Sequence, residues 1–239
     1  MTMTTETRCS TFIDLGALAR TTDLAPGPDP FGPGARMLPV RAGPCEIFLS
    51  CVKDAGECQE NRGDCWLFAC TGLLEIADDN RSAAIAQGTS AVIARGTTFR
   101  WRAPEGAIVI GMRYLQAAAG RPGIHTIDNN APRKQSGTPA DEVLLGERPA
   151  CRSHNVFRSA SGEFQCGTWD STPYQRLPIY FEHSELMHLL AGEVTFVDEN
   201  GARATFRKGD TYIIEQGASV SWESHEFVAK IYAQYRPAT

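Results

Sequence analysis

The sequence predicts an all-β protein in which one domain occurs twice. Residues 88–101 (GTSAVIARGTTFRW) and residues 209–222 (GDTYIIEQGASVSW) share a pattern of glycines that ends at tryptophan. A constant separation of 121 residues holds for three pairs: Gly88 and Gly209, Gly96 and Gly217, Trp101 and Trp222. A register held over a whole segment indicates an internal repeat. The apolar runs around it are short, rich in Val, Ile, Phe, Tyr and Thr, and separated by Gly and Asp or Asn, which is typical of strands.

The repeat extends in both directions from this segment. Upstream, residues 65–80 match residues 185–200 at a separation of 120, and one extra residue near Gly201 accounts for the change in a polar turn where added length is tolerated. Downstream, residues 109–114 match residues 230–235 at a separation of 121. Each copy therefore predicts two apolar strands, a glycine-containing turn that ends at tryptophan, and a final alternating strand, an order that favours a sandwich or a closed barrel.

The repeat also sets the expected domain boundaries. Residues 45–115 form the first domain and residues 159–239 the second. Residues 1–44 are rich in proline and predict an irregular N-terminal arm. Residues 116–158 combine Pro, Gly and Asn at a density that predicts a connector or strap with little regular structure.

Composition excludes several classes of partner. The chain has 239 residues, 42% of them hydrophobic, a formal net charge of −5 and a pI of about 5.6. Because no basic run with interleaved aromatic residues occurs, we expect no nucleic-acid partner. No apolar stretch approaches the length of a membrane span and the N-terminus has no apolar signal core, so we expect no membrane partner and a cytoplasmic location. The eight cysteines include no Cys-x-x-Cys pair, which favours buried thiols without disulfides.

The pattern of Glu185 and Gly192 followed by Gly209-Asp210, Gly217 and Trp222 resembles the cupin superfamily. The terminal tryptophan and the run ELMHLLAGEV look most like the branch named for ureidoglycine aminohydrolase. The resemblance implies a bicupin, which is two double-stranded β-helix (jelly-roll) barrels in one chain, each with a mouth that can hold a small molecule.

Many cupins hold a divalent metal through two histidines separated by one residue, a glutamate a few residues later and a third histidine on the second motif. In the second copy only Glu185 stands at its expected position. The two histidine positions fall on Ile179 and Phe181, or on Pro178 and Tyr180 with a longer loop, and the third falls on Val220. We therefore expect no metal cofactor, with His183 and Glu185 as the candidate ligands should a divalent metal bind. In the first copy, Cys58, Glu60 and Cys65 are the alternative zinc ligands.

His183 and Glu185 are two residues apart, so on a strand both side chains point to one face, and His188 points to the other. Two further interpretations of the pair stay open: it lines a metal-free pocket, or Glu185 only ties down a loop. In an apolar pocket walled by Met187, Val220 and Trp222, burial would raise the pKa of Glu185. That would suit Glu185 to general acid or base catalysis with His183 as its proton partner, and we assign both a catalytic role.

The expected substrate-binding residues are Tyr180, Arg176, Glu215 and Trp222, near the rim of the second barrel. Arg176 would anchor a substrate carboxylate with two hydrogen bonds, and the alternative is a solvated loop charge. Trp222 occupies the same position as Trp101, so it serves either as core in both barrels or as a pocket wall.

From these observations we expect the second barrel to bind a small polar metabolite. If the protein is an enzyme, we expect it to be an isomerase, a lyase or an aminohydrolase. The alternative is a non-catalytic module that binds a metabolite or dimerises without metal. The partners expected are a small-molecule ligand and a second copy of the chain in a homodimer.

Overall fold

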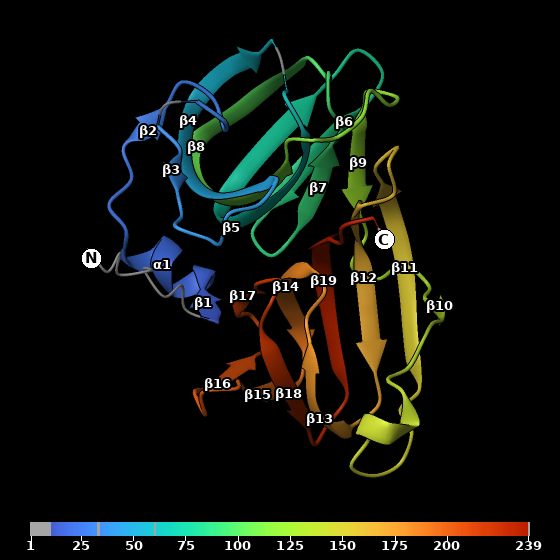
Figure 1. Cartoon of the computed structure of the whole chain (residues 1–239). Helices are drawn as coiled ribbons and strands as arrows, with labels where there is room; N and C mark the ends of the chain where they lie inside the picture. The colour runs from blue at the N-terminus through green and yellow to red at the C-terminus, as the bar shows by residue number, and fades with distance from the viewer. Residues whose placement is uncertain (1–10, 33, 60, 239) are drawn as a thin grey trace, which may run out of the picture.

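The structure is a computed structural model that describes residues 11–32, 34–59 and 61–238. Its regular secondary structure is nearly all strand, and the strands form two β-barrels arranged one above the other (Figure 1). The exceptions are helix α1 (Leu15–Thr21), capped by Asp14, and a short 3-10 helix η1 (Asp141–Val143). The predicted all-β bicupin architecture is confirmed. No helix in the described part of the chain is long and apolar enough to cross a membrane.

Barrel 1 is built on one sheet with the order β2-β4-β8-β5-β7-β9, in which β3 pairs with β4 and β6 with β5. Its strands are β2 (Pro26–Gly27), β3 (Arg36–Met37), β4 (Cys45–Cys58), β5 (Asp64–Ala77), β6 (Ser82–Ala86), β7 (Ser90–Ile93), β8 (Phe99–Tyr114) and β9 (Ile124–Ile127). The three long strands β4, β5 and β8 run through both layers of the barrel, which is why a single sheet closes it.

Barrel 2 has two sheets, with the orders β1-β17-β14-β19-β12-β11-β10 and β13-β18-β15-β16. Its strands are β1 (Phe12–Asp14), β10 (Lys134–Gln135), β11 (Cys151–Arg158), β12 (Phe164–Ser171), β13 (Tyr174–Tyr180), β14 (Ser184–Ala191), β15 (Glu193–Val197), β16 (Arg203–Arg207), β17 (Thr211–Ile214), β18 (Ser219–Ser224) and β19 (Val228–Tyr235). At the repeat separation of 120, β5 of barrel 1 covers the same positions as β14 and β15 together.

The repeated glycines explain part of this geometry. Gly72 and Gly192, which are repeat partners, have φ angles of 72° and 77°. A Cβ atom at either position would lie 2.2 Å from a backbone carbonyl oxygen, that of Gly106 or of Phe227. Only glycine fits such a left-handed position with so close a backbone neighbour, so both copies keep it where the chain turns between layers.

The two barrels pack through the outer faces of their main sheets. A continuous apolar core joins them, to which both copies contribute large side chains: Trp66, Ile110 and Met112 from barrel 1, and Phe164, Leu186 and Ile231 from barrel 2. Repeat partners meet across this core, since the rings of Tyr114 and Tyr235 stack 5.3 Å apart and those of Phe68 and His188 lie 4.4 Å apart. The contact is therefore close to two-fold symmetric, as in a dimer of single barrels.

Segments outside the repeat complete the sheets. Strand β1, from the N-terminal arm, pairs with β17 of barrel 2, just as β9 pairs with β7 of barrel 1. The expected connector contains more regular structure than its composition indicates, because residues 151–158 form β11 and pair along β12. The N-terminal arm and the connector therefore both contribute strands to barrel 2.

Candidate functional site

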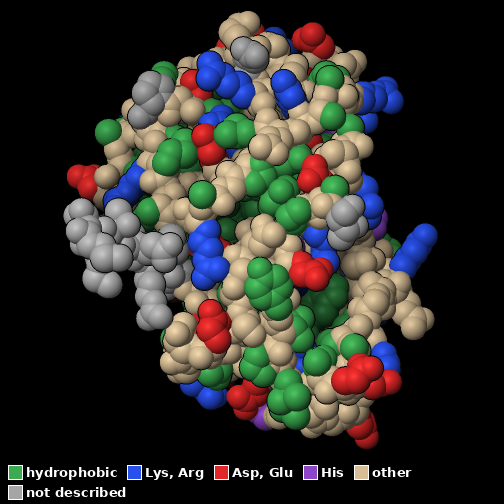
Figure 2. All heavy atoms as spheres, in the orientation of Figure 1, with side chains coloured by type: hydrophobic (Ala, Val, Ile, Leu, Met, Phe, Trp, Pro, Cys, Tyr) green, Lys and Arg blue, Asp and Glu red, His purple; other side chains and the backbone are tan. Residues whose placement is uncertain are grey.

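A cavity of about 500 Å³ opens in barrel 2 between its two sheets. Its lining includes five side chains that carry charge or can carry it: Arg176, His183, Glu185, Lys230 and Arg236. The wall also includes five aromatic side chains: Trp169, Tyr174, Phe181, Trp222 and Tyr232. On the face drawn in Figure 2 the surface of barrel 2 is hollowed, with hydrophobic side chains visible inside the hollow.

Strand alternation decides which side chains reach this cavity. On β14, Glu185 points into barrel 2, whereas Leu186 packs in the core between the barrels. His188 points away from the cavity, as predicted, and its Nδ1 lies 2.9 Å from the Thr211 hydroxyl. On β19, Lys230 and every second residue after it, as far as Arg236 beyond the strand end, line the cavity.

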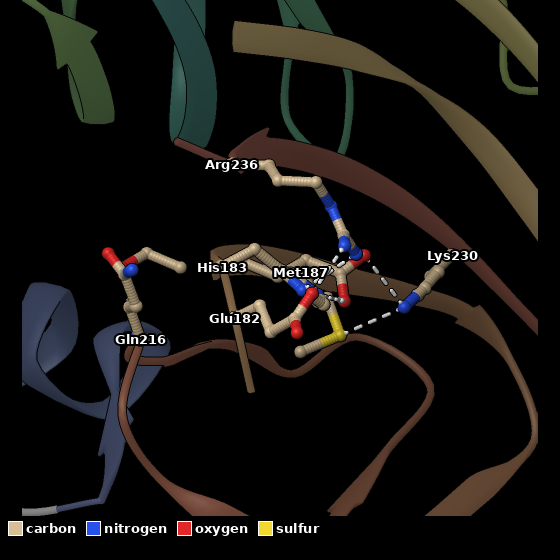
Figure 3. Close-up of polar contacts among 8 residues, drawn as sticks. Glu182, His183, Met187, Gln216, Lys230 and Arg236 are labelled. Atoms are coloured by element: carbon tan, nitrogen blue, oxygen red, sulfur yellow. Dashed lines mark hydrogen bonds and ion pairs between the residues drawn. The ribbon is translucent and has the colours of Figure 1, made fainter. Parts of the chain in front are cut away.

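Lys230 and Glu185 form an ion pair at the bottom of the site. The Lys230 ammonium donates to Glu185 Oε1 at 2.9 Å and contacts Met187 Sδ at 3.1 Å (Figure 3). It also lies 4.9 Å from the ring centre of Trp169 and 5.8 Å from that of Trp222, within the range of cation–π attraction. Both side chains of the ion pair are about nine-tenths buried.

This ion pair reverses the expected titration of Glu185. Burial alone would raise the pKa of its carboxyl group, as the sequence predicts. The charge of Lys230, with smaller contributions from His183, outweighs burial and lowers that pKa below its ordinary value. The prediction of a raised pKa was wrong, because nothing in the local sequence of β14 reveals a lysine on β19.

His183 connects the ion pair to the mouth of the cavity. Its Nε2 lies 3.8 Å from Glu185 Oε2, and its ring stacks on Phe181 at 4.6 Å. Arg236 Nη2 lies 3.1 Å from His183 Nδ1. Because an arginine nitrogen can only donate, Nδ1 is the acceptor of this hydrogen bond. The ring proton is then on Nε2, the nitrogen that faces Glu185.

Arg176 lies on the opposite wall, on β13, and is only 5% exposed. Its Nη1 donates to the carbonyl oxygens of Val220 at 2.6 Å and Leu177 at 3.1 Å. Among the described residues no carboxylate lies within ion-pair distance of it, and burial lowers the pKa of its guanidinium. Arg176 is thus a buried cation with neutral partners, which excludes the alternative of a solvated loop charge.

Trp222 is at once core and cavity wall. Its ring stacks on Tyr174 at 5.2 Å and meets Trp169 edge-on at 5.7 Å, and its Nε1 donates to Ser224 Oγ at 3.0 Å. Trp222 is the cross-strand neighbour of Arg176, and the Lys230 ammonium lies 5.8 Å from the centre of the Trp222 ring. The aromatic wall therefore has a cation near each side. Trp222 therefore packs in the core of barrel 2 and also forms part of the cavity wall, so both interpretations from the sequence apply to it.

Tyr180 and Glu215 lie elsewhere. Both line a second cavity of about 250 Å³ beside residues 40–44 of the N-terminal arm. Glu215 is buried there and accepts from the backbone N–H of Arg41 at 2.9 Å, while Tyr180 is 64% exposed. The expectation that both lie at the rim of the barrel 2 site is corrected: Ile179 and Phe181 face the cavity, so alternation turns Tyr180 away.

The donor set of barrel 2 does not fit the metal site that many cupins carry. The structure sets Ile179, Phe181 and Val220 in and around the cavity wall, where apolar side chains supply no ligand. Within the described ranges no three His, Cys, Asp or Glu side chains come together. In barrel 1, burial raises the pKa of Cys65, which disfavours the thiolate that zinc needs, and Glu60 lies outside the described residues.

The positions of Glu185 and Lys230 are occupied by apolar residues in barrel 1. The repeat partners of Glu185 and Lys230 are Cys65 and Val109, both fully buried in an apolar core. Phe31, from the N-terminal arm, inserts its ring against Phe48 at 6.0 Å and Phe99 at 5.7 Å. Aromatic side chains therefore pack inside barrel 1, and an ion pair of this barrel lies elsewhere: the Arg113 guanidinium binds Glu46 and lies over the rings of Phe31 and Phe48.

Sequence reasoning missed Lys230 and Arg236. The signal was present for Lys230: it is the charged residue in an otherwise apolar alternating run, and its repeat partner is a valine. A buried lysine at an apolar repeat position indicates either an ion pair or a ligand.

Fold and cavity together define a bicupin. A family model described as the EutQ-like cupin domain matches residues 158–232, which make up most of barrel 2. A protein of unknown function from Pseudomonas syringae pv. tomato, of the DUF861 family, is 30% identical over 90% of this chain and 93% of its own, with a TM-score of 0.82. The chain belongs to this family of cupins.

More distant structures share the fold alone. A cupin 2 conserved barrel domain protein from Leptotrichia buccalis aligns at 12% identity over 97% of this chain and 99% of its own, with a TM-score of 0.63. Protein Ylba from E. coli, also of the DUF861 family, aligns at 11% identity over 86% of this chain and 84% of its own, with a TM-score of 0.55. No curated protein shows significant sequence similarity to the chain.

Proposed function

We propose that barrel 2 binds a small organic anion, such as a carboxylate with a flat apolar body. The observation that carries the proposal is Arg176, a buried guanidinium whose direct contacts are all neutral and on which Glu185 acts only from beyond ion-pair distance. A buried charge without a counter-ion costs several kcal/mol, on the order of the penalty for an unpaired ion. A ligand carboxylate would supply the missing counter-ion with two parallel hydrogen bonds.

The charge balance of the cavity supports the same class of ligand. Three cationic side chains and one carboxylate line it, and the carboxylate is already engaged by Lys230. The aromatic wall of Trp169, Tyr174 and Trp222 suits a flat apolar body.

Isothermal titration calorimetry tests this proposal with matched pairs of ligands. A small carboxylate such as benzoate should bind, and its neutral amide should not. Binding should weaken at least about tenfold in Arg176→Met. The matched control is Arg102→Met, because Arg102 is an exposed arginine of barrel 1. Equal binding of the amide, or unchanged affinity in Arg176→Met, would contradict the proposal.

A second candidate function is proton-transfer catalysis on the bound anion, in the isomerase or lyase class. It is favoured by the chain of contacts from Lys230 through Glu185 to His183, three groups that can hold or pass a proton inside one cavity. Turnover of a bound carboxylate followed by NMR, and its loss in Glu185→Gln with binding retained, would test this candidate.

An aminohydrolase of the ureidoglycine type has less support, because metal-activated water is the usual route to such hydrolysis and three of the four ligand positions are apolar. Metal analysis of the purified protein tests that candidate. Stoichiometric manganese, zinc or iron that disappears in Glu185→Ala would favour it over simple anion binding.

A further inference from the structure

Lys230 is the one buried lysine of the chain. The sequence contains four lysines, Lys53, Lys134, Lys208 and Lys230, and all lie in the described part of the chain. The first three are exposed, whereas the side chain of Lys230 is 8% exposed and its amine ends in the cavity of barrel 2. A lysine amine held in a partly apolar pocket is the kind of group that attacks carbonyl carbons.

The surroundings hold the amine in place beside a proton acceptor, and the attack must overcome the stabilisation that the ion pair gives to the ammonium. A lysine must lose a proton before it is a nucleophile, and Glu185 Oε1 is in direct contact with its N–H at 2.9 Å. Met187 Sδ and the faces of Trp169 and Trp222 fix the amine from the other sides. His183 lies within 4 Å of the second Glu185 oxygen and links the pair toward the mouth.

Arg176 defines the orientation of the ligand relative to Lys230. It is the cross-strand neighbour of Trp222, and the Lys230 ammonium lies 5.8 Å from the centre of the same indole ring. The two cations therefore flank one aromatic wall from opposite sheets. A carboxylate held by Arg176 would carry its neighbouring carbon along this wall toward Lys230.

We infer that Lys230 forms a reversible imine with the carbonyl group of a small oxo acid bound in barrel 2. The inference rests on the proposed function, which supplies the bound carboxylate. In the step, Glu185 takes one proton from the ammonium and the free amine attacks the carbonyl carbon. One of the two remaining N–H protons then moves to the former carbonyl oxygen, which gives the carbinolamine with its hydroxyl group. Glu185 returns the proton to the hydroxyl group of the carbinolamine, which leaves as water. The balance is ammonium plus carbonyl giving protonated imine plus water, with no other reactant.

Reductive trapping tests the inference. The full-length protein is incubated with pyruvate or glyoxylate and sodium cyanoborohydride, and the adduct is quantified by intact mass and located by peptide mapping. We expect one adduct per chain, located on Lys230. It should be lost in Lys230→Arg, which keeps the positive charge beside Glu185, and reduced at least tenfold in Arg176→Met. Acetone, which has the carbonyl but no carboxylate, should label Lys230 at least tenfold less.

Lys208→Met is the matched control, because Lys208 is exposed, and its adduct yield should equal that of the unsubstituted chain. Calorimetry with propionate and pyruvate separates the two proposals. Anion binding that depends on Arg176, without an adduct on Lys230, overturns the imine and leaves the proposed function standing. Adducts spread evenly over the four lysines also overturn it. Absence of binding by either anion overturns the proposed function and the imine together.

Discussion

The Lys230 ammonium lies 2.9 Å from the Glu185 carboxylate inside barrel 2, at two positions that barrel 1 fills with Val109 and Cys65. The duplicated fold therefore accommodates apolar residues at both positions. Desolvating two charges costs more than burying two apolar side chains, so an ion pair is not the more stable choice there. The fold therefore does not require an ion pair at these two positions.

Lys230→Met should destabilise the protein by about 3–5 kcal/mol, because it leaves the Glu185 carboxylate buried and unpaired. Adding Glu185→Gln to that variant should recover most of the loss. Denaturant unfolding of the wild type, both single variants and the double variant measures the coupling. A loss in the double variant equal to the sum of the two single-variant losses would show that the pair does not interact.

The pairing of Glu185 also predicts a pH dependence. Its pKa is lowered in the folded state, so its contribution to stability is complete above its ordinary pKa of 4.5 and is lost as the pH falls below that value toward the folded pKa. The difference in unfolding free energy between the wild type and Glu185→Gln should be constant from pH 7 to about pH 5. It should shrink steadily at lower pH, and a difference that grows on acidification would contradict the assignment.

Arg176→Met should separate binding from stability. The substitution removes a buried cation that has only neutral partners, so the lost hydrogen bonds are offset by relief of the desolvation cost. We expect the unfolding free energy to stay within about 1 kcal/mol of wild type while carboxylate affinity falls. A large destabilisation would mean that Arg176 is a structural residue and would weaken its assignment as a ligand anchor.

Phe31→Ala tests the aromatic filling of barrel 1. The ring is partly buried against Phe48 and Phe99, so its removal should cost about 2 kcal/mol. Anion binding, measured by calorimetry, should not change, because Phe31 lies in the other barrel. Weakened binding in this variant would indicate that the two barrels share one site.

The close backbone approach at Gly192 predicts that alanine destabilises the protein more there than at Gly201, a glycine of similar conformation. Gly192 and Gly201 have φ angles of 77° and 78°, but a Cβ atom at Gly201 meets nothing within 4 Å. Gly201→Ala should therefore cost about 1 kcal/mol, the cost of the left-handed conformation. Gly192→Ala should cost at least about 1 kcal/mol more, because its Cβ would collide with the Phe227 carbonyl oxygen. Thermal or denaturant unfolding compares the two.

Much of the barrel 2 wall follows from strand alternation. The inward direction of Glu185 and the outward direction of His188 could be predicted from their positions on one strand. The outward direction of Tyr180 follows from the same alternation, whereas the place of Glu215 could not be predicted, because it depends on its contact with Arg41 of the N-terminal arm. The pKa direction of Glu185 also could not be predicted, since it depends on a lysine 45 residues away in sequence.

The sequence by itself determined the duplication, the strand content and the glycine turns, because these depend on local pattern and on spacing along the chain. Only the tertiary structure decided that Arg176, Glu185 and Lys230 line one cavity and that Arg176 has no acidic partner. Side chains on separate strands meet through the pairing and closure of sheets, and the energy of a buried charge depends on every neighbour that folding brings to it.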